Sequence, residues 1–202
     1  MTEIGENAFN GCASLTSADI PNSVTNIGSG AFYNCSSIER VTIGNGIESI
    51  GSTAFRLCSN LKTVELDCAN VDTWFNSLSS IEQVVLGKNV QSIARRAFYN
   101  TKNTTLTSVT SLIPADALFA VNNLVKDYSI CTLYVPTGAK ETYAATSEWS
   151  NFANIVEMDL TGVEKVKGQS GESKAIYDLQ GRKVDAPSNG IYIIDGKKVW
   201  IK

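Results

Sequence analysis

The chain has 202 residues, with 17 Lys and Arg against 20 Asp and Glu, which gives a net charge of −3. Hydrophobic residues make up 43% and charged residues 18%, a composition that excludes disorder throughout and argues against nucleic acid or an anionic membrane as an electrostatic partner. There is no histidine, so a Ser-His-Asp triad, a Cys-His dyad and imidazole metal sites are excluded. We expect no catalytic residue, no cofactor, no metal and no transmembrane segment.

A repeat with a step of 23 residues starts at the N-terminus. It is marked by an Ile-Gly pair, an Ala-Phe pair and a cysteine. These recur as Ile4-Gly5, Ile27-Gly28 and Ile50-Gly51; as Ala8-Phe9, Ala31-Phe32 and Ala54-Phe55; and as Cys12, Cys35 and Cys58. One period shared by several residue types indicates a repeat architecture.

Each repeat contains two kinds of local pattern. The Leu-x-x-Val-x-Ile part alternates as a short strand, and the Ala-Phe-x-x-Cys part suits one helical or 3-10 turn. A single repeat cannot bury its own Phe, Ile and Leu, whereas stacked coils can. The sequence therefore predicts a mainly β fold with short helical turns: a solenoid of five to six coils of about 23 residues.

The repeat becomes less regular toward the C-terminus. A fourth repeat runs over 70–92 with Trp74 in place of Ala and Leu78 in place of Cys, and the third must be about three residues shorter. A fifth repeat carries Ala97-Phe98. Further strands are expected at 106–109 and 132–136.

The run from Ile20 to Cys35 resembles the repeat of the BspA-like leucine-rich repeat family, and the resemblance extends from residue 4 to about residue 100. It implies that the predicted solenoid is a leucine-rich-repeat solenoid, with the small C-terminal β-hairpin appendage described below, and that the protein is a surface or secreted protein of anaerobic bacteria. Residues 131–157 resemble the segment that ends such arrays, so we place the solenoid with its terminal cap at 1–158. The chain begins in the middle of the pattern, without a signal peptide, which indicates a start further upstream.

Residues 159–174 are rich in Gly, Ser, Lys and Glu and are predicted to be a linker. Residues 175–202 predict a small β segment with hairpin turns at Gln180-Gly181 and Asp195-Gly196. The motif from Asp178 to Val184, followed by Gly190-x-Tyr192, resembles the C-terminal sorting domain of the type IX secretion system. The resemblance implies an extracellular or outer-membrane surface location; the alternative is that the hairpins simply finish the fold.

Cys12, Cys35 and Cys58 share one repeat position and are predicted to stack inside the solenoid as free thiols, because Cys behaves as a small apolar filler. Cys68 and Cys131 have no Cys-x-x-Cys partner. We expect neither a disulfide nor a zinc site.

With Leu, Val and Ile facing inward, the remaining strand positions form an exposed face. The predicted binding face consists of Glu39, Arg40, Thr42, Lys62, Thr63, Glu65, Glu82, Gln83 and Val85. An open sheet offers no enclosed pocket in which a carboxylate could be tuned for catalysis.

The leading hypothesis is a non-catalytic cell-surface or secreted module for protein interaction or adhesion. It would bind a protein, or a host or microbial surface component. The alternatives are a carbohydrate-binding module and a structural stalk for an upstream domain. We expect a monomer, or a weak dimer formed through the uncapped N-terminal coil.

Overall fold

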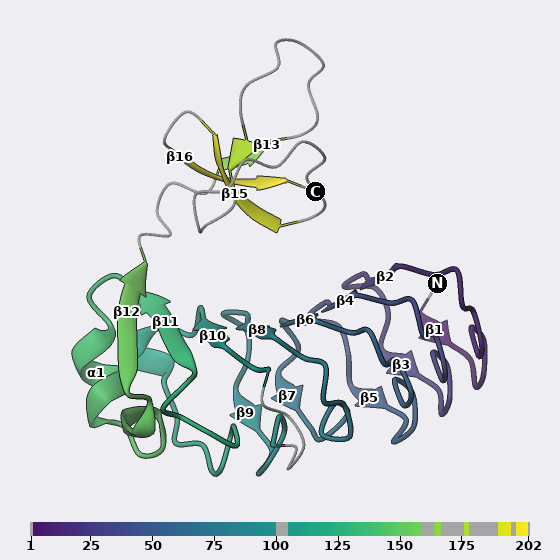
Figure 1. Ribbon diagram of the computed structural model, residues 1–202, viewed down its shortest axis with the longest axis horizontal. Helices are drawn as coiled ribbons and strands as arrows, with labels where there is room; N and C mark the ends of the chain where they lie inside the picture. The colour runs from purple at the N-terminus through teal and green to yellow at the C-terminus, as the bar shows by residue number, and fades with distance from the viewer. Residues whose placement is uncertain are drawn as a thin grey trace. The chain divides into compact units, whose positions relative to one another are not determined.

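The computed structural model describes residues 2–99 and 105–158, together with four strands between residues 164 and 201. The chain divides into two compact units, Met1–Glu157 and Met158–Lys202. The first unit is a stack of coils in which strands from successive coils lie side by side (Figure 1).

One strand from each coil joins a seven-stranded sheet. These strands are β2 (Ser17–Ile20), β4 (Arg40–Ile43), β6 (Thr63–Leu66), β8 (Gln83–Leu86), β10 (Ser108–Ser111), β11 (Thr132–Pro136) and β12 (Asn154–Met158). Neighbours from β2 to β11 are parallel. Thr63 pairs with Gln83, a step of 20 residues, which confirms the shortened third repeat. The strands predicted near 106–109 and at 132–136 are confirmed as β10 and β11.

Shorter strands line the opposite side of the stack (Figure 1). Three form one parallel sheet, β1 (Glu3–Ile4), β3 (Asn26–Ile27) and β5 (Ser49–Ile50), and two form another, β7 (Asn70–Val71) and β9 (Ser92–Ile93). The coils that carry β1 to β9 therefore cross the stack twice, and the row of short strands is interrupted between β5 and β7.

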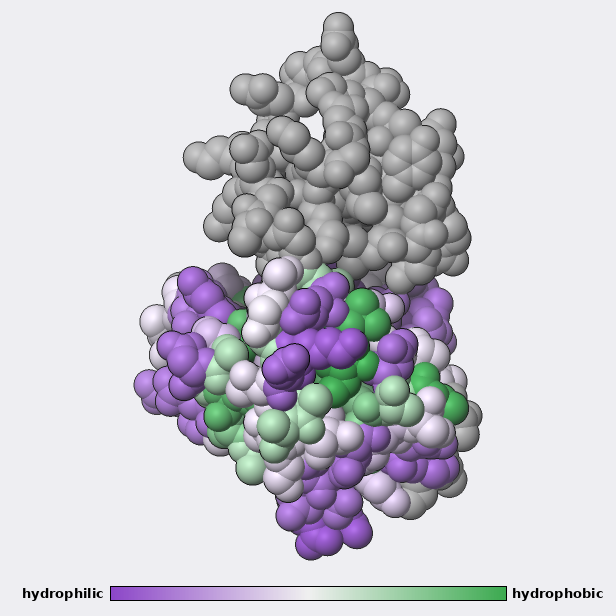
Figure 2. Space-filling model, turned by 90° about the vertical axis from the view of Figure 1, so that its left-hand side faces the viewer, coloured by the Kyte–Doolittle hydropathy of each residue, from purple (hydrophilic) through white to green (hydrophobic). Residues whose placement is uncertain are grey.

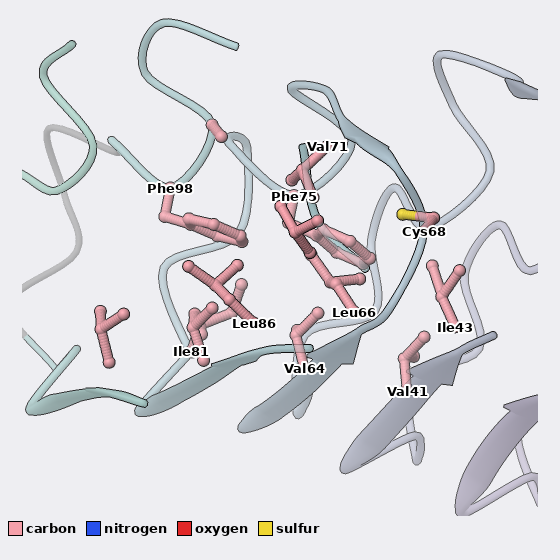
Figure 3. Close-up of a cluster of buried hydrophobic side chains, with 14 of the residues drawn as sticks. Val41, Ile43, Val64, Leu66, Cys68, Val71, Phe75, Ile81, Leu86 and Phe98 are labelled. Atoms are coloured by element: carbon pink, nitrogen blue, oxygen red, sulfur yellow. The ribbon is translucent and has the colours of Figure 1, made fainter. Parts of the chain in front are cut away.

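The labelled side chains of β4, β6 and β8, Val41, Ile43, Val64, Leu66 and Leu86, point into the space between the two rows of strands (Figure 3). Val41, Ile43 and Val64 are fully buried, as the alternation predicted. Above them runs a ladder of stacked rings: Phe9 on Phe32 at 5.1 Å, Phe32 on Phe55 at 5.3 Å, and Phe55 on Phe75 at 5.0 Å between centroids. The ladder continues through the fourth repeat, although Trp74 replaces its alanine.

The Ala-Phe-x-x-Cys segments make one turn and stop. The amide of Cys35 donates to the carbonyl of Phe32 at 3.3 Å, and Cys58 donates to Phe55 at the same distance. Two residues after the phenylalanine the backbone turns left-handed, with φ of 56° at Asn34 and 65° at Leu57. Such a residue ends a helical turn. The three described helices, η1 (Ala115–Ala117), α1 (Lys140–Ala145) and η2 (Trp149–Asn151), lie beyond the regular repeats.

A polar and aromatic cap closes the C-terminal end of the stack. Tyr143 and Trp149 are fully buried, and the Trp149 Nε1–H donates to the carbonyl of Phe119 at 2.8 Å. The Glu157 carboxylate accepts from the amides of Gly138 and Lys140 at 2.9 and 3.1 Å, at the start of α1. On the outside of this end, hydrophobic residues are interspersed with hydrophilic ones (Figure 2).

The first coil has no such cover, and the prediction that its ladder residues are buried is wrong there. Cys12 is exposed and Phe9 is 38% exposed, whereas Cys35 and Phe32 in the second coil are 0% and 2% exposed. Ile4 in the same coil is 5% exposed, so the Ala-Phe-x-x-Cys turn, and not the strand residue Ile4, loses its cover.

The second unit contains a four-stranded sheet. Its strands are β13 (Glu164–Val166), β14 (Ile176–Tyr177), β15 (Gly190–Ile194) and β16 (Lys197–Ile201), in the order β13-β16-β15-β14. β15 pairs antiparallel with β16, as expected for the second predicted hairpin, whereas the antiparallel partner of β14 is β15 and not a strand directly after residue 181. β13 falls within the segment predicted as a linker. The predicted turn residues and the motif from Asp178 to Val184 lie outside the described residues.

Candidate functional site: the outward face of the sheet

The outward face of the long-strand sheet carries two rows of side chains. Parallel register aligns equivalent positions from coil to coil, because side chains alternate along each strand. The first row is Ser17, Arg40, Thr63, Gln83, Ser108 and Thr132. The second row is Asp19, Thr42, Glu65, Val85, Thr110 and Tyr134. Two continuous rows across separate coils make one extended surface.

A third row lies just before the strands. Glu39, Lys62 and Glu82 are exposed, and backbone hydrogen bonds of 2.9 Å from Lys62 to Glu39 and 2.8 Å from Glu82 to Lys62 link them. Gln83 is also exposed, whereas the other five predicted residues, Arg40, Thr42, Thr63, Glu65 and Val85, are half-buried. The structure thus places six of the nine predicted residues in the two outward rows of β4, β6 and β8, and the other three, Glu39, Lys62 and Glu82, directly before these strands.

A charged cluster lies at the N-terminal half of this face. Arg40 Nη1 lies 3.8 Å from Glu65 Oε1, with side-chain exposures of 20% and 12%. The two residues sit diagonally on neighbouring strands, within reach of long side chains. Burial raises the pKa of Glu65; the guanidinium of Arg40 opposes this shift and the carboxylate of Asp19 adds to it. The cluster presents a half-buried ion pair together with a second acid, Asp19.

In the two rows, the part of the face on β10 and β11 is uncharged. The predicted binding face did not include the β11 residues. Thr132 and Tyr134 extend the two rows on β11, beside Ser108 and Thr110. Asn154 on β12 donates from its amide to the Thr132 hydroxyl at 3.2 Å. The signal for these residues was the alternation of Thr-Leu-Tyr-Val-Pro, with Leu133 and Val135 buried. The face therefore passes from charged groups to hydroxyls and one tyrosine.

The face is suited to binding and offers no enclosed reaction centre. In the described ranges, no three His, Cys, Asp or Glu residues are grouped as metal ligands need to be. The hollow lined by Phe98, Leu106 and Ile130 lies away from the two rows. None of the helices in this part of the chain has the length and apolar character that a membrane span requires.

The buried cysteines have structural roles. The Cys35 thiol donates to the carbonyl of Phe9 at 2.9 Å, and the Cys58 thiol donates to the carbonyl of Phe32 at 3.2 Å. Each thiol thus ties its coil to the coil before it. Desolvation raises the pKa of both thiols, that of Cys58 to about 12. At neutral pH they remain protonated and poorly nucleophilic. All five cysteines are free thiols.

Coils that each add one strand to a parallel sheet, with aligned ladders of Phe and Cys, define the leucine-rich-repeat class of solenoid. The sequence pattern described as "BspA type Leucine rich repeat region" matches six copies over residues 2–125. The chain belongs to the BspA-type leucine-rich repeat family. No curated protein sequence matches it.

Solved structures of bacterial leucine-rich-repeat proteins are similar to this chain. The T. pallidum leucine-rich repeat protein TpLRR is 25% identical over 70% of this chain and 75% of its own, with a TM-score of 0.44. The pneumococcal vaccine antigen PcpA is 16% identical over 72% of this chain and 42% of its own, with a TM-score of 0.44. A leucine-rich cell surface protein of Faecalibacterium prausnitzii is 20% identical over 79% and 65%, with a TM-score of 0.29.

Proposed function

We propose that the protein is a non-catalytic interaction or adhesion module of the cell surface or of the secreted fraction, and that it binds a protein ligand on the outward face of the sheet. The observation that carries the proposal is the alignment of three rows of side chains across coils that are far apart in sequence. Such a surface can contact an extended partner at many points without a pocket.

The two halves of the face suggest how a partner would be recognised. The Arg40–Glu65 pair is half-buried in the free chain, so less side-chain entropy is lost when a ligand contacts it than at a fully exposed pair. Tyr134 supplies a rigid amphipathic side chain of the kind enriched at interfaces. The exposed Glu39, Lys62 and Glu82 would form a polar rim and tune specificity.

The test is a binding screen against extracellular-matrix proteins and a glycan panel. A face variant would carry Gln83→Ala, Thr110→Ala and Tyr134→Ala, which remove contacts while leaving the ion pair intact. We expect a protein hit whose affinity falls at least tenfold in this variant. The matched control, Glu48→Ala, Arg56→Ala and Glu141→Ala, changes exposed residues elsewhere and should bind as the parent chain does.

The outcomes separate the alternatives. A glycan hit with no protein hit would favour the carbohydrate-binding module. Silence on both panels, or equal binding by the face variant and the parent chain, would contradict the proposal and favour a stalk.

The proposed location rests on the resemblance of residues 175–202 to a type IX sorting domain. With the same signal peptide added to both, we expect a chain ended at residue 174 to remain in the periplasm of a host with that secretion system, while the full chain reaches the surface or the medium. The measurement is protease accessibility on intact cells. Equal surface exposure of the two chains would contradict the proposal that residues 175–202 direct export.

A further inference from the structure

One residue of the Phe turns adopts a backbone conformation that its side chain disfavours. Leu57 has φ of 65°, in the left-handed region. The equivalent positions of the two preceding coils hold Gly11 at 72° and Asn34 at 56°, the residue types that tolerate this conformation. The coil itself sets this backbone, because the carbonyl accepts from the amide two residues on both at Gly11, from Ala13 at 2.7 Å, and at Leu57, from Ser59 at 2.9 Å. A leucine at this position therefore strains the turn.

Burial does not fully compensate for this strain. Leu57 is 49% exposed, whereas Phe55 and Cys58 in the same turn are 1% and 0% exposed. Its coil is covered on both sides, since the Phe55 ring stacks on Phe32 and on Phe75. The exposure of Leu57 thus belongs to an internal coil and not to an end of the stack. An exposed leucine in a strained position is unfavourable for folding on two counts.

The other left-handed residues have evident reasons for their conformation. Six of the nine described residues with positive φ are Gly or Asn. Glu148 has φ of 69°, and its carboxylate accepts from the amide of Asn123 at 3.2 Å within the cap. Arg96 has φ of 63°, and its guanidinium lies 5.3 Å from the centre of the Tyr99 ring. Leu57 remains as the residue whose apolar side chain is half in solvent, which points to a role outside the fold.

The surroundings of Leu57 are aromatic and basic. Arg56 is exposed beside it, and Tyr33, the equivalent of Arg56 one coil earlier, is half-buried. The amide of Asn34 donates to the carbonyl of Arg56 at 2.9 Å, which holds the two coils side by side. The Phe turns lie across the core from β4, β6 and β8, as the positions of Phe75 and Phe98 show (Figure 3). The turn segments 28–36, 51–59, 72–79 and 94–99 contain three arginines and one acid, all exposed: Arg56, Arg95, Arg96 and Asp72.

We infer that Tyr33, Arg56 and Leu57, the turn patch, form a second docking surface, distinct from the outward face, for an acidic polypeptide segment that carries an apolar side chain. The apolar side chain would cover Leu57, and its carboxylates would face Arg56. Tyr and Arg are enriched at the centres of protein interfaces. The net positive charge of the Phe turns, in a chain of net charge −3, selects an anionic partner. Leu57 favours a polypeptide over an anionic glycan, because burying an aliphatic side chain needs apolar surface on the partner.

The variant Leu57→Asn separates this role from a structural one. Asparagine tolerates the left-handed conformation, as Asn34 does one coil earlier, so relief of strain offsets the lost contacts of the leucine. We expect the thermal midpoint of the full chain to stay level or to rise, while affinity for the acidic segment falls at least tenfold. A fall in the midpoint of more than about 4 °C would show that Leu57 stabilises the fold and would overturn the inference. Asn34→Leu, the reverse change one coil earlier, should lower the midpoint.

The probe is a library of random peptides displayed on phage. Peptides are selected on the full chain, and those that also bind a chain with Arg56→Glu and Leu57→Asn are removed. We expect the remaining peptides to carry Asp or Glu beside an aromatic or aliphatic residue. Synthetic copies should bind at least tenfold less tightly to either single variant, and less tightly as salt rises.

Four results would overturn the inference: no peptide survives the removal step, the surviving peptides lack acidic residues, their affinity is unchanged by Leu57→Asn, or only heparin, a sulfated glycan, binds, through Arg56 and independently of Leu57. The two docking surfaces fail separately. The face variant with Tyr134→Ala should still bind the acidic peptides, whereas the control variant of the outward face should lose them because it contains Arg56→Ala.

Discussion

Phe32→Ala should lower the free energy of unfolding of the solenoid by about 3–5 kcal/mol. The ring is 2% exposed and lies between Phe9 and Phe55 in the stack, with centroid distances of 5.1 and 5.3 Å. Its removal leaves a cavity in the middle of the ladder. The coils on either side are held by strands and backbone hydrogen bonds, so they cannot collapse into the gap. The measurement is urea unfolding followed by circular dichroism.

Phe9→Ala is the matched control, since it removes the same atoms from the last ring of the same ladder. Phe9 is 38% exposed and has a ring on one side only. We expect less than half the loss seen for Phe32→Ala. Equal losses at the two positions would contradict the ladder as the source of stability, because the cavity term depends on enclosure.

The repeat predicted most of the fold because each coil repeats the same physical requirement. Val and Ile at alternate strand positions must face the core, and the offset between Phe75 and Ile81 matches that between Phe9 and Leu15. Because this offset fixes where the fourth repeat begins, it predicted that the third repeat is about three residues shorter. The pairing of Thr63 with Gln83, which are 20 residues apart, agrees with that prediction. Since the register follows from the core, the same pattern also predicted the alignment of Arg40 with Thr63 and Gln83, and of Thr42 with Glu65 and Val85.

The sequence could not predict the properties that depend on neighbouring coils. Cys12 has the same local sequence context as Cys35, and the two differ only in whether a coil lies before them. Likewise, the contact between Arg40 and Glu65 joins residues 25 positions apart and follows from strand register and twist, not from either coil alone. Tyr134 was missed because it belongs to the irregular coil before the cap, where the repeat motif has faded.

The glycines of the Ile-Gly pairs provide the other large expected effect. Gly51→Ala should destabilise the solenoid by about 3 kcal/mol, because the new Cβ would lie 2.5 Å from the Cα and amide nitrogen of Ser29. Those atoms belong to the backbone of an internal coil, which is held on both sides. The clash can be relieved only by separating two coils, and the 2.8 Å hydrogen bond from Gly51 to the carbonyl of Ile27 would lengthen.

The three glycines form a graded series that isolates this cause. Gly28→Ala meets the backbone of Glu6 at the same 2.5 Å, yet the first coil is free on one side and can shift, so we expect a smaller loss. Gly5→Ala meets nothing within 4 Å and should change stability least. Thermal melts of the three variants would measure the series. An equal loss at all three positions would indicate an intrinsic preference of the strand for glycine, whereas the order Gly51, Gly28, Gly5 would establish that close coil contact selects the residue.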